Sequence, residues 1–203
     1  MKLPKVSFFL ICILGLLGSI TNGLAQSNLD TLNHYYKTII SPKTTQDLPS
    51  GIRFYTKRMQ TNKNNRDTVN LIQDLRMLAI GEFKIGNNYD SEEYIVEALD
   101  LIDNSSLKSS MNSAKVGLYN QLGRIYRVSN NTTQALDAYD DALKIATNTT
   151  DSIVVLNNKA NIYKDIKAYD QAIDIYHILF DKAQSIQDSL RMALALDNLG
   201  DVQ

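Results

Sequence analysis

The stretch YNQLGRIY, residues 119–126, decides the fold of this chain. Tyr119, Leu122 and Tyr126 recur at the spacing of one helical face, yet Gly123 stands among them. A glycine in a helix interior costs about 1 kcal/mol relative to alanine. We therefore predict that Gly123 lies where another helix approaches too closely to leave room for a side chain.

Small residues recur along the chain at positions equivalent to Gly123. Ala160 and Gly200 stand at positions equivalent to Gly123, and Ala79 does so in a weaker unit that begins near Ile72. From Gly123 onward these positions are separated by 37 and then 40 residues. Self-similarity at a nearly constant period is the signature of a repeat architecture. The chain is therefore predicted to consist of repeated units.

Each unit is predicted to contain two helices separated by a short polar break. In the unit from Val116, the break at 129–131 is followed by Ala135, Tyr139 and Ala142 at i, i+4 and i+7. The next unit repeats both faces with Leu156, Ala160, Tyr163, Ala172, Tyr176 and Leu179. Small and large residues therefore alternate along the faces that would pack inward.

The unit at 116–146 resembles the tetratricopeptide repeat. That family places a large residue, a Leu-Gly pair and a tyrosine on its first helix, then alanine, an aromatic residue and alanine on its second. The matching residues are Tyr119, Leu122, Gly123, Tyr126, Ala135, Tyr139 and Ala142. The following unit departs at Lys159, where the family usually has leucine, and at Leu179, where it usually has alanine. The resemblance implies an all-α fold, a right-handed solenoid of antiparallel helix pairs.

Residues 66–203 are predicted to hold the repeats. The expected units cover about 72–108, 116–149 and 153–187, with a truncated unit from 193. Residues 26–65 are predicted to be an N-terminal helical segment or a degenerate repeat. Its apolar pattern indicates one helix before Pro42 and another after Asp47, and the polar stretch 61–66 is interpreted as a connection.

Helix starts give independent support for these units. Asp67, Asp151 and Asp188 each precede a serine or threonine and then an aliphatic residue, so they are predicted N-caps. The extra length of the units is expected in the connections near 147–150 and 185–188. The last unit stops within its first helix, which leads us to expect a longer protein.

Residues 1–25 have the pattern of a secretory signal peptide. Lys2 and Lys5 precede an apolar run at 6–17, and small residues lead to a cleavage site after Ala25. An uncleaved N-terminal anchor is the alternative interpretation, because the run is near the lower length limit for a membrane span. Both interpretations predict an exported protein, periplasmic or on the cell surface.

The composition gives little support to catalysis. Apolar residues make up 44% of the chain, charged residues 21%, and the formal net charge is −1, which fits a soluble protein without a basic face for nucleic acid. His34 and His177 have no neighbours at metal-ligand spacing, and no glycine-rich phosphate loop occurs. We predict no enzyme activity, no cofactor and no metal site.

A polar stripe beside the packed face is the candidate binding site. In the tetratricopeptide family, first helices line a groove that binds extended peptides, so the resemblance implies that this stripe contacts a partner. It consists of Asn120, Arg124, Arg127, Asn157, Asn161 and Lys164. Asparagine can bond to peptide backbone, while arginine and lysine favour carboxylates, so a partner segment with acidic residues or a free C-terminus is expected. The alternative is that the stripe is only the polar side of an amphipathic helix.

Three functional hypotheses follow. The first is noncovalent recognition of a protein or peptide segment by an exported repeat scaffold. The second rests on a resemblance to the extracytoplasmic repeat regions of bacterial sensor proteins, and makes this chain the sensory part of a membrane-bound histidine kinase or transcriptional regulator. The third is a purely structural scaffold. In all three, membrane contact comes only through an uncleaved N-terminus or a further C-terminal part.

Overall fold

The computed structural model describes residues 28–108 and 110–202, and those residues form helices without any strand. The chain divides into two compact units, residues 1–54 and 55–203, with the boundary inside helix α2 (Asp47–Asn65). The predicted signal peptide lies outside the described residues. Each unit is therefore considered by itself.

The first unit contains two helical stretches that pack closely. Residues 28–40 are helical, and α2 begins at Asp47, as the apolar pattern predicts. A Cβ atom at Gly51 would lie 2.6 Å from Oγ1 of Thr38, so the approach of the two stretches depends on glycine. The rings of Tyr35 and Phe54 stack nearby, with centroids 4.1 Å apart.

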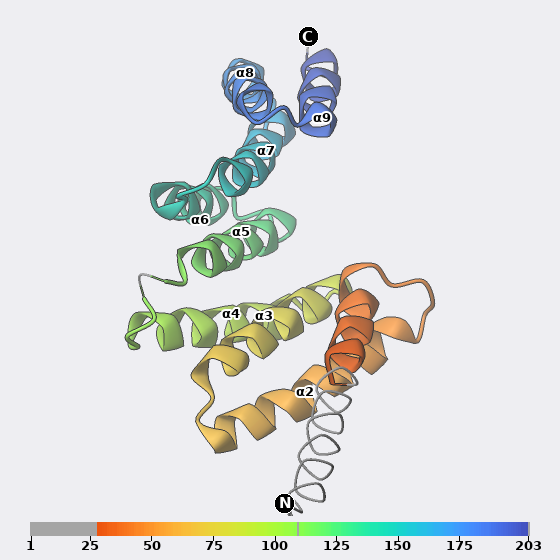
Figure 1. The fold of residues 1–203 in the computed structure, drawn as a ribbon. Coiled ribbons are helices and arrows are strands. Elements are labelled where there is room, and N and C mark those ends of the chain that lie inside the picture. The colour runs from red at the N-terminus through yellow and green to blue at the C-terminus, as the bar shows by residue number, and fades with distance from the viewer. Residues whose placement is uncertain (1–27, 109, 203) are drawn as a thin grey trace, which may run out of the picture. The chain divides into compact units, whose positions relative to one another are not determined.

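The second unit is a series of helix pairs (Figure 1). Its helices after α2 are α3 (Thr68–Lys84), α4 (Asn88–Asp103), α5 (Asn112–Val128), α6 (Thr132–Ile145), α7 (Thr149–Asp165), α8 (Tyr169–Ser185) and α9 (Ser189–Gly200). The prediction of an all-α solenoid of helix pairs is confirmed. Here α3, α5, α7 and α9 are called first helices, and α4, α6 and α8 second helices.

The close approach predicted at Gly123 is confirmed. A Cβ atom there would lie 2.7 Å from Cδ1 of Tyr139, whose side chain on α6 is fully buried. Ala79 and Ala160 are also buried at the equivalent positions of α3 and α7. Gly200 differs, since no atom from another part of the described chain lies within 4 Å of the place where its Cβ would be. Close packing therefore explains Gly123 but not Gly200.

The interpretation of residues 61–66 as a connection is wrong. Helix α2 continues to Asn65, and the turn to α3 contains only Arg66 and Asp67. Five of the six residues at 61–66 are exposed, and the buried one, Asn62, donates through Nδ2 to a carboxylate oxygen of Asp74 at 2.6 Å. A largely exposed helix end with one buried polar contact was thus mistaken for a loop.

The predicted helix starts are correct in two places out of three. Asp67 caps α3 and Asp188 caps α9, each accepting from a backbone amide three residues later. The N-cap of α7 is instead Asn148, which accepts from the backbone amide of Asp151 at 2.8 Å. Asp151 lies in the first turn of α7, where its negative charge still suits the helix dipole.

The extra length of the repeats lies in helices rather than in the predicted connections. Helix α8 has 17 residues where α6 has 14. The connections at 146–148 and 186–188 are both short, and the longest connection after α3 is 104–111, between α4 and α5. Within the described residues, no helix is both long and apolar enough to cross a membrane.

Candidate functional site

The six residues predicted to bind a partner lie on two first helices. Asn120, Arg124 and Arg127 belong to α5, and the other three occupy equivalent places on α7. All six side chains are partly buried. The name first-helix face is used for the surface that these six residues form together with the polar side chains of α7 and α9 that contact them.

Asparagine pairs join successive first helices on this face. Oδ1 of Asn120 accepts from Nδ2 of Asn158 at 2.8 Å, which links α5 to α7. Oδ1 of Asn157 accepts from Nδ2 of Asn198 at 3.1 Å, which links α7 to α9. The two bonds repeat with the period of the units, so these asparagines serve contacts between repeats.

Ion pairs repeat in the same way. Nε of Arg127 lies 2.6 Å from Oδ2 of Asp165, and Nζ of Lys164 lies 2.7 Å from Oδ2 of Asp201. The hydrogen bond that Arg127 donates to Asp165 raises the pKa of Arg127. Arg127 and Lys164 are thus each neutralised by an aspartate at the end of the next first helix, and the face is not uniformly basic.

Asn161 also has a partner within its own repeat. Its Oδ1 accepts from the hydroxyl of Tyr176 on α8 at 2.8 Å. Tyr139 is the equivalent tyrosine on α6, but α5 carries Arg124 where α7 carries Asn161. The buried hydroxyl of Tyr139 has no hydrogen-bond partner among the described residues. The exchange of asparagine for arginine therefore leaves one polar atom unsatisfied.

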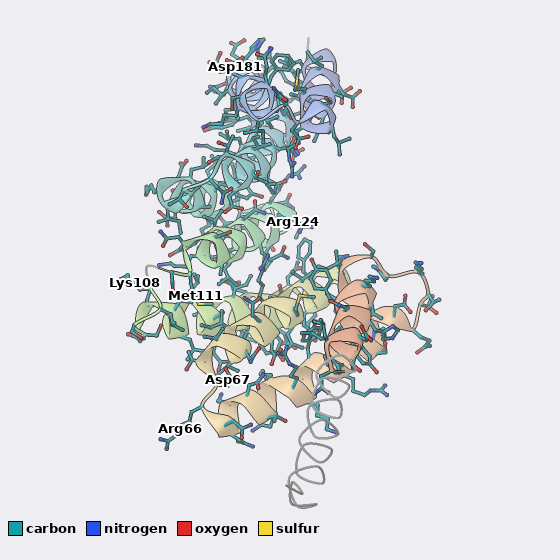
Figure 2. The ribbon with its side chains drawn as sticks, viewed as in Figure 1. Arg66, Asp67, Lys108, Met111, Arg124 and Asp181 are labelled. Atoms are coloured by element: carbon teal, nitrogen blue, oxygen red, sulfur yellow. The ribbon has the colours of Figure 1, made fainter. Side chains whose placement is uncertain are left out.

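Arg124 is the member of the stripe that no carboxylate neutralises. Its Nη1 donates to Oε1 of Gln121 at 2.8 Å, and its guanidinium lies 4.7 Å from the ring centroid of Phe83 on α3. No described carboxylate lies within ion-pair distance of it. Burial lowers the pKa of Arg124, and the nearby charge of Arg127 lowers it further. Figure 2 labels Arg124 on α5.

Two unsatisfied polar atoms accompany this guanidinium. The amide nitrogen Nε2 of Gln121 has no hydrogen-bond partner among the described residues, and neither has the hydroxyl of Tyr139. Burial raises the pKa of Tyr139 to about 12, although Arg127 and Arg124 oppose the shift. The hydroxyl therefore stays protonated and can donate. Both unsatisfied atoms are buried, so the partly exposed guanidinium of Arg124 is the group that can offer donors to a carboxylate or a peptide carbonyl.

Sequence reasoning missed several residues of this arrangement. Gln121 and Tyr139 were assigned no polar role, and the carboxylates of Asp165 and Asp201 were not recognised as partners of the basic residues. A signal for the ion pairs was present, since both aspartates follow their cations by about one repeat. Whether the side chains of Gln121 and Tyr139 find hydrogen-bond partners depends on side-chain packing, which a single sequence does not reveal.

Comparison with known proteins gives a family match for one repeat unit. Residues 116–149 match the family profile described as tetratricopeptide repeat. This chain contains a tetratricopeptide repeat. The matched segment covers most of α5, all of α6 and the first residue of α7, so it includes both Gly123 and Arg124.

A solved structure supports the same fold. The chain is similar to the crystal structure of BtubC (BKLC) from P. vanneervenii, with a TM-score of 0.65 and 22% sequence identity. The match covers 79% of this chain and 66% of that one. At this identity the similarity shows the fold alone. No match was found among curated proteins.

Tetratricopeptide repeats typically act as non-catalytic scaffolds that bind proteins or peptides, using surfaces made by stacked repeats. Within the described residues, no group of three or more potential ligands could hold a metal ion. His34 packs edge-on against Tyr35, and His177 is exposed on α8.

Proposed function

We propose that this chain binds an extended protein or peptide segment on the first-helix face, and that Arg124 receives an acidic group of that segment. The observation that carries the proposal is the partly buried guanidinium of Arg124, which has no carboxylate among the described residues. Burying a charge without an opposite charge costs free energy, and a ligand carboxylate would offset that cost.

The other members of the stripe have a different role in this proposal. Arg127 and Lys164 already have carboxylate partners, and the asparagine pairs fix the spacing of the first helices. These contacts fix the arrangement of the face, while the partly buried guanidinium of Arg124 keeps donors that no described carboxylate uses. A stripe that was only the polar side of an amphipathic helix would not need to hold a cation partly buried without an opposite charge.

The test uses peptides selected on the purified protein from a random display library. Arg124→Met removes the charge but keeps an apolar stem against Phe83, and we expect it to weaken binding of the selected acidic peptides about tenfold or more. Arg53→Ala, at an exposed position of α2, is the matched control and should leave affinity unchanged. Equal affinity of wild type and Arg124→Met, with thermal unfolding preserved, would refute the proposal.

Asn161 is a poor second site for such a test. Its Oδ1 accepts the hydroxyl of the buried Tyr176, so Asn161→Ala would leave that hydroxyl without a partner. A loss of binding in that variant would mix an effect on packing with an effect on recognition. Asn120→Asp is equally unsuitable because it would disturb the pair with Asn158.

We also propose that the protein is exported, on the support of residues 1–25 alone. Fusion of residues 1–40 to a reporter enzyme that is active only outside the cytoplasm should give active reporter, and Leu10→Arg with Leu14→Arg should abolish it.

A sensory role ahead of a kinase or regulator domain is supported by resemblance alone. Sequencing of the full gene tests it, since a sensory role requires an apolar span and an output domain in the same protein.

A further inference from the structure

A groove runs along the exposed side of the second helix α4, away from the residues of the first-helix face. It has a volume of about 730 Å³. Apart from Thr68 at the start of α3, its walls come from α4 and the two residues that follow it. The lining residues are Thr68, Tyr89, Glu92, Glu93, Val96, Glu97, Asp100, Leu101, Asn104 and Ser105.

Apolar side chains are exposed in this groove. Tyr89 is 77% exposed and Val96 is 46% exposed, while Leu101 is half-buried beside them. Tyr89 and Val96 are seven residues apart, so they lie on one side of the helix, two turns from each other. Exposed apolar groups gathered in a hollow, rather than scattered singly, are typical of an interaction surface.

The polar lining of the groove is acidic and only partly neutralised. Glu97 pairs with Nζ of Lys63 at 3.1 Å, and Glu92 accepts from the hydroxyl of Tyr126 at 2.7 Å. Glu93 and Asp100 make no ion pair within the described part of the chain. Along α4, Tyr89, Glu93, Val96 and Asp100 stand at i, i+4, i+7 and i+11. Apolar and acidic side chains therefore alternate along one side of the helix.

We propose that this α4 groove binds a basic peptide segment in which lysine or arginine alternates with apolar residues. Charge complementarity specifies the occupant, because Glu93 and Asp100 lack cations and stand on either side of Val96. The stripe from Tyr89 to Asp100 is about 16 Å long at the helical rise, the span of roughly five extended residues. The partner therefore needs only a short segment with two or more basic side chains.

This groove and the first-helix face select opposite charges. Arg124 on α5 favours an acidic segment, whereas Glu93 and Asp100 on α4 favour a basic one. The two surfaces belong to different helices, so a variant in one leaves the residues of the other unchanged. Failure of either proposal can thus be recognised without failure of the other.

The test measures binding of a labelled short peptide that repeats Lys-Leu-Ser, with a Glu-Leu-Ser peptide for comparison. Wild-type protein should bind the lysine peptide about tenfold or more tightly than the glutamate peptide, and less tightly as salt is added. Glu93→Lys with Asp100→Lys should weaken binding of the lysine peptide about tenfold, and Val96→Ser should weaken it several-fold.

Asp170→Lys with Asp174→Lys is the matched control. These exposed aspartates on α8 are one turn apart, whereas Glu93 and Asp100 are two turns apart, and the double change shifts the net charge equally. We expect this control and Arg124→Met to bind the lysine peptide like the wild type. An equal loss in the α8 control would mean nonspecific attraction, and an unchanged affinity in the folded α4 variant would mean that the groove is not the site; either result overturns the proposal.

Discussion

At the scale of single residues, Gly123 determines how closely α5 and α6 pack. A Cβ added at residue 123 would lie against the ring of Tyr139. Gly123→Ala should therefore destabilise the protein by about 1–3 kcal/mol through overpacking, although alanine has the better helix propensity. Gly117→Ala is the control in the same helix, because the nearest atom is 3.4 Å away at the flexible end of Arg76. Urea denaturation should show that Gly117→Ala is neutral or stabilises by about 0.5–1 kcal/mol. Similar effects of the two changes would contradict the packing argument.

Two equivalent tyrosines should respond differently to loss of their hydroxyls. Tyr176→Phe removes the hydrogen bond to Asn161 and should cost about 1 kcal/mol. Tyr139→Phe removes a buried hydroxyl that has no described partner, so stability should stay within about 0.5 kcal/mol or rise. Thermal unfolding of both variants measures the difference. A larger loss in Tyr139→Phe than in Tyr176→Phe would show that the Tyr139 hydroxyl is bonded in solution.

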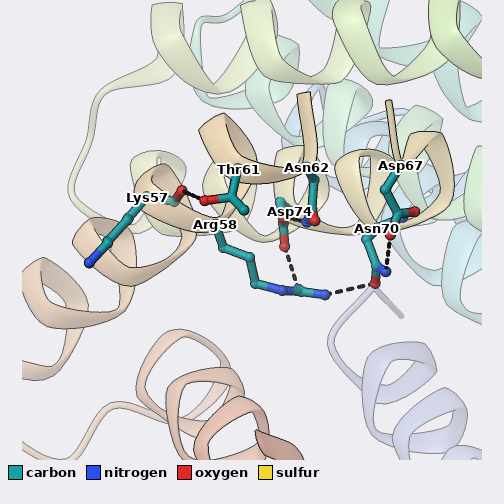
Figure 3. A network of polar contacts seen from close by, with 7 residues as sticks. All are labelled: Lys57, Arg58, Thr61, Asn62, Asp67, Asn70 and Asp74. Atoms are coloured by element: carbon teal, nitrogen blue, oxygen red, sulfur yellow. Dashed lines mark hydrogen bonds and ion pairs between the residues drawn. The ribbon is translucent and has the colours of Figure 1, made fainter. Parts of the chain in front are cut away.

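At the scale of elements, the contact between the end of α2 and α3 is built from polar groups. Asp74 on α3 is fully buried and accepts from Arg58 and Asn62 of α2 (Figure 3). Arg58 also donates to Oδ1 of Asn70 at 2.7 Å, and Asn70 donates to Asp67. This network lies beside an apolar contact, since Met59 of α2 packs against the cluster that includes Leu71 and Leu75. It also explains why sequence analysis took the end of α2 for a loop.

The buried carboxyl of Asp74 makes stability depend on pH. Burial raises its pKa from 3.8 to about 6, although Arg58 and Asn62 oppose the shift. Between those two values the folded protein binds more protons than the unfolded chain, so this group stabilises the fold as pH falls and loses that contribution as pH rises to about 6. From pH 7 to about 5, the free energy of unfolding of the wild type should rise by about 1 kcal/mol relative to that of Asp74→Asn.

Urea denaturation at several pH values checks this prediction by comparing the two proteins. Other carboxyls contribute with the opposite sign, since hydrogen bonds lower the pKa values of Asp67 and Asp188. The contribution of Asp188 is common to both proteins and cancels in the difference, and that of Asp67 cancels apart from its charge interaction with Asp74. Parallel pH curves for the wild type and Asp74→Asn would show that Asp74 has an ordinary pKa in the folded state.

At the scale of the whole molecule, the sequence predicted architecture better than it predicted the site. Helix pairs could be recognised because Gly123, Ala160 and the buried tyrosines repeat with the period of the units. The site depends on which polar side chain reaches which neighbour. Arg124 and Arg127 look equivalent in a sequence stripe, yet Arg127 meets Asp165 across a repeat boundary and Arg124 meets only Gln121 and an aromatic ring.

The central claim, that Arg124 receives an acidic group of a partner, is tested most directly by the NMR signals of arginine side chains. Protein labelled with ¹⁵N is titrated with an acidic peptide selected on it, and each Nε–Hε signal is assigned by substitution. The account predicts a large shift for Arg124 and a small one for Arg127, which stays paired with Asp165. Binding that leaves the Arg124 signal unmoved, or that moves Arg127 instead, would contradict it.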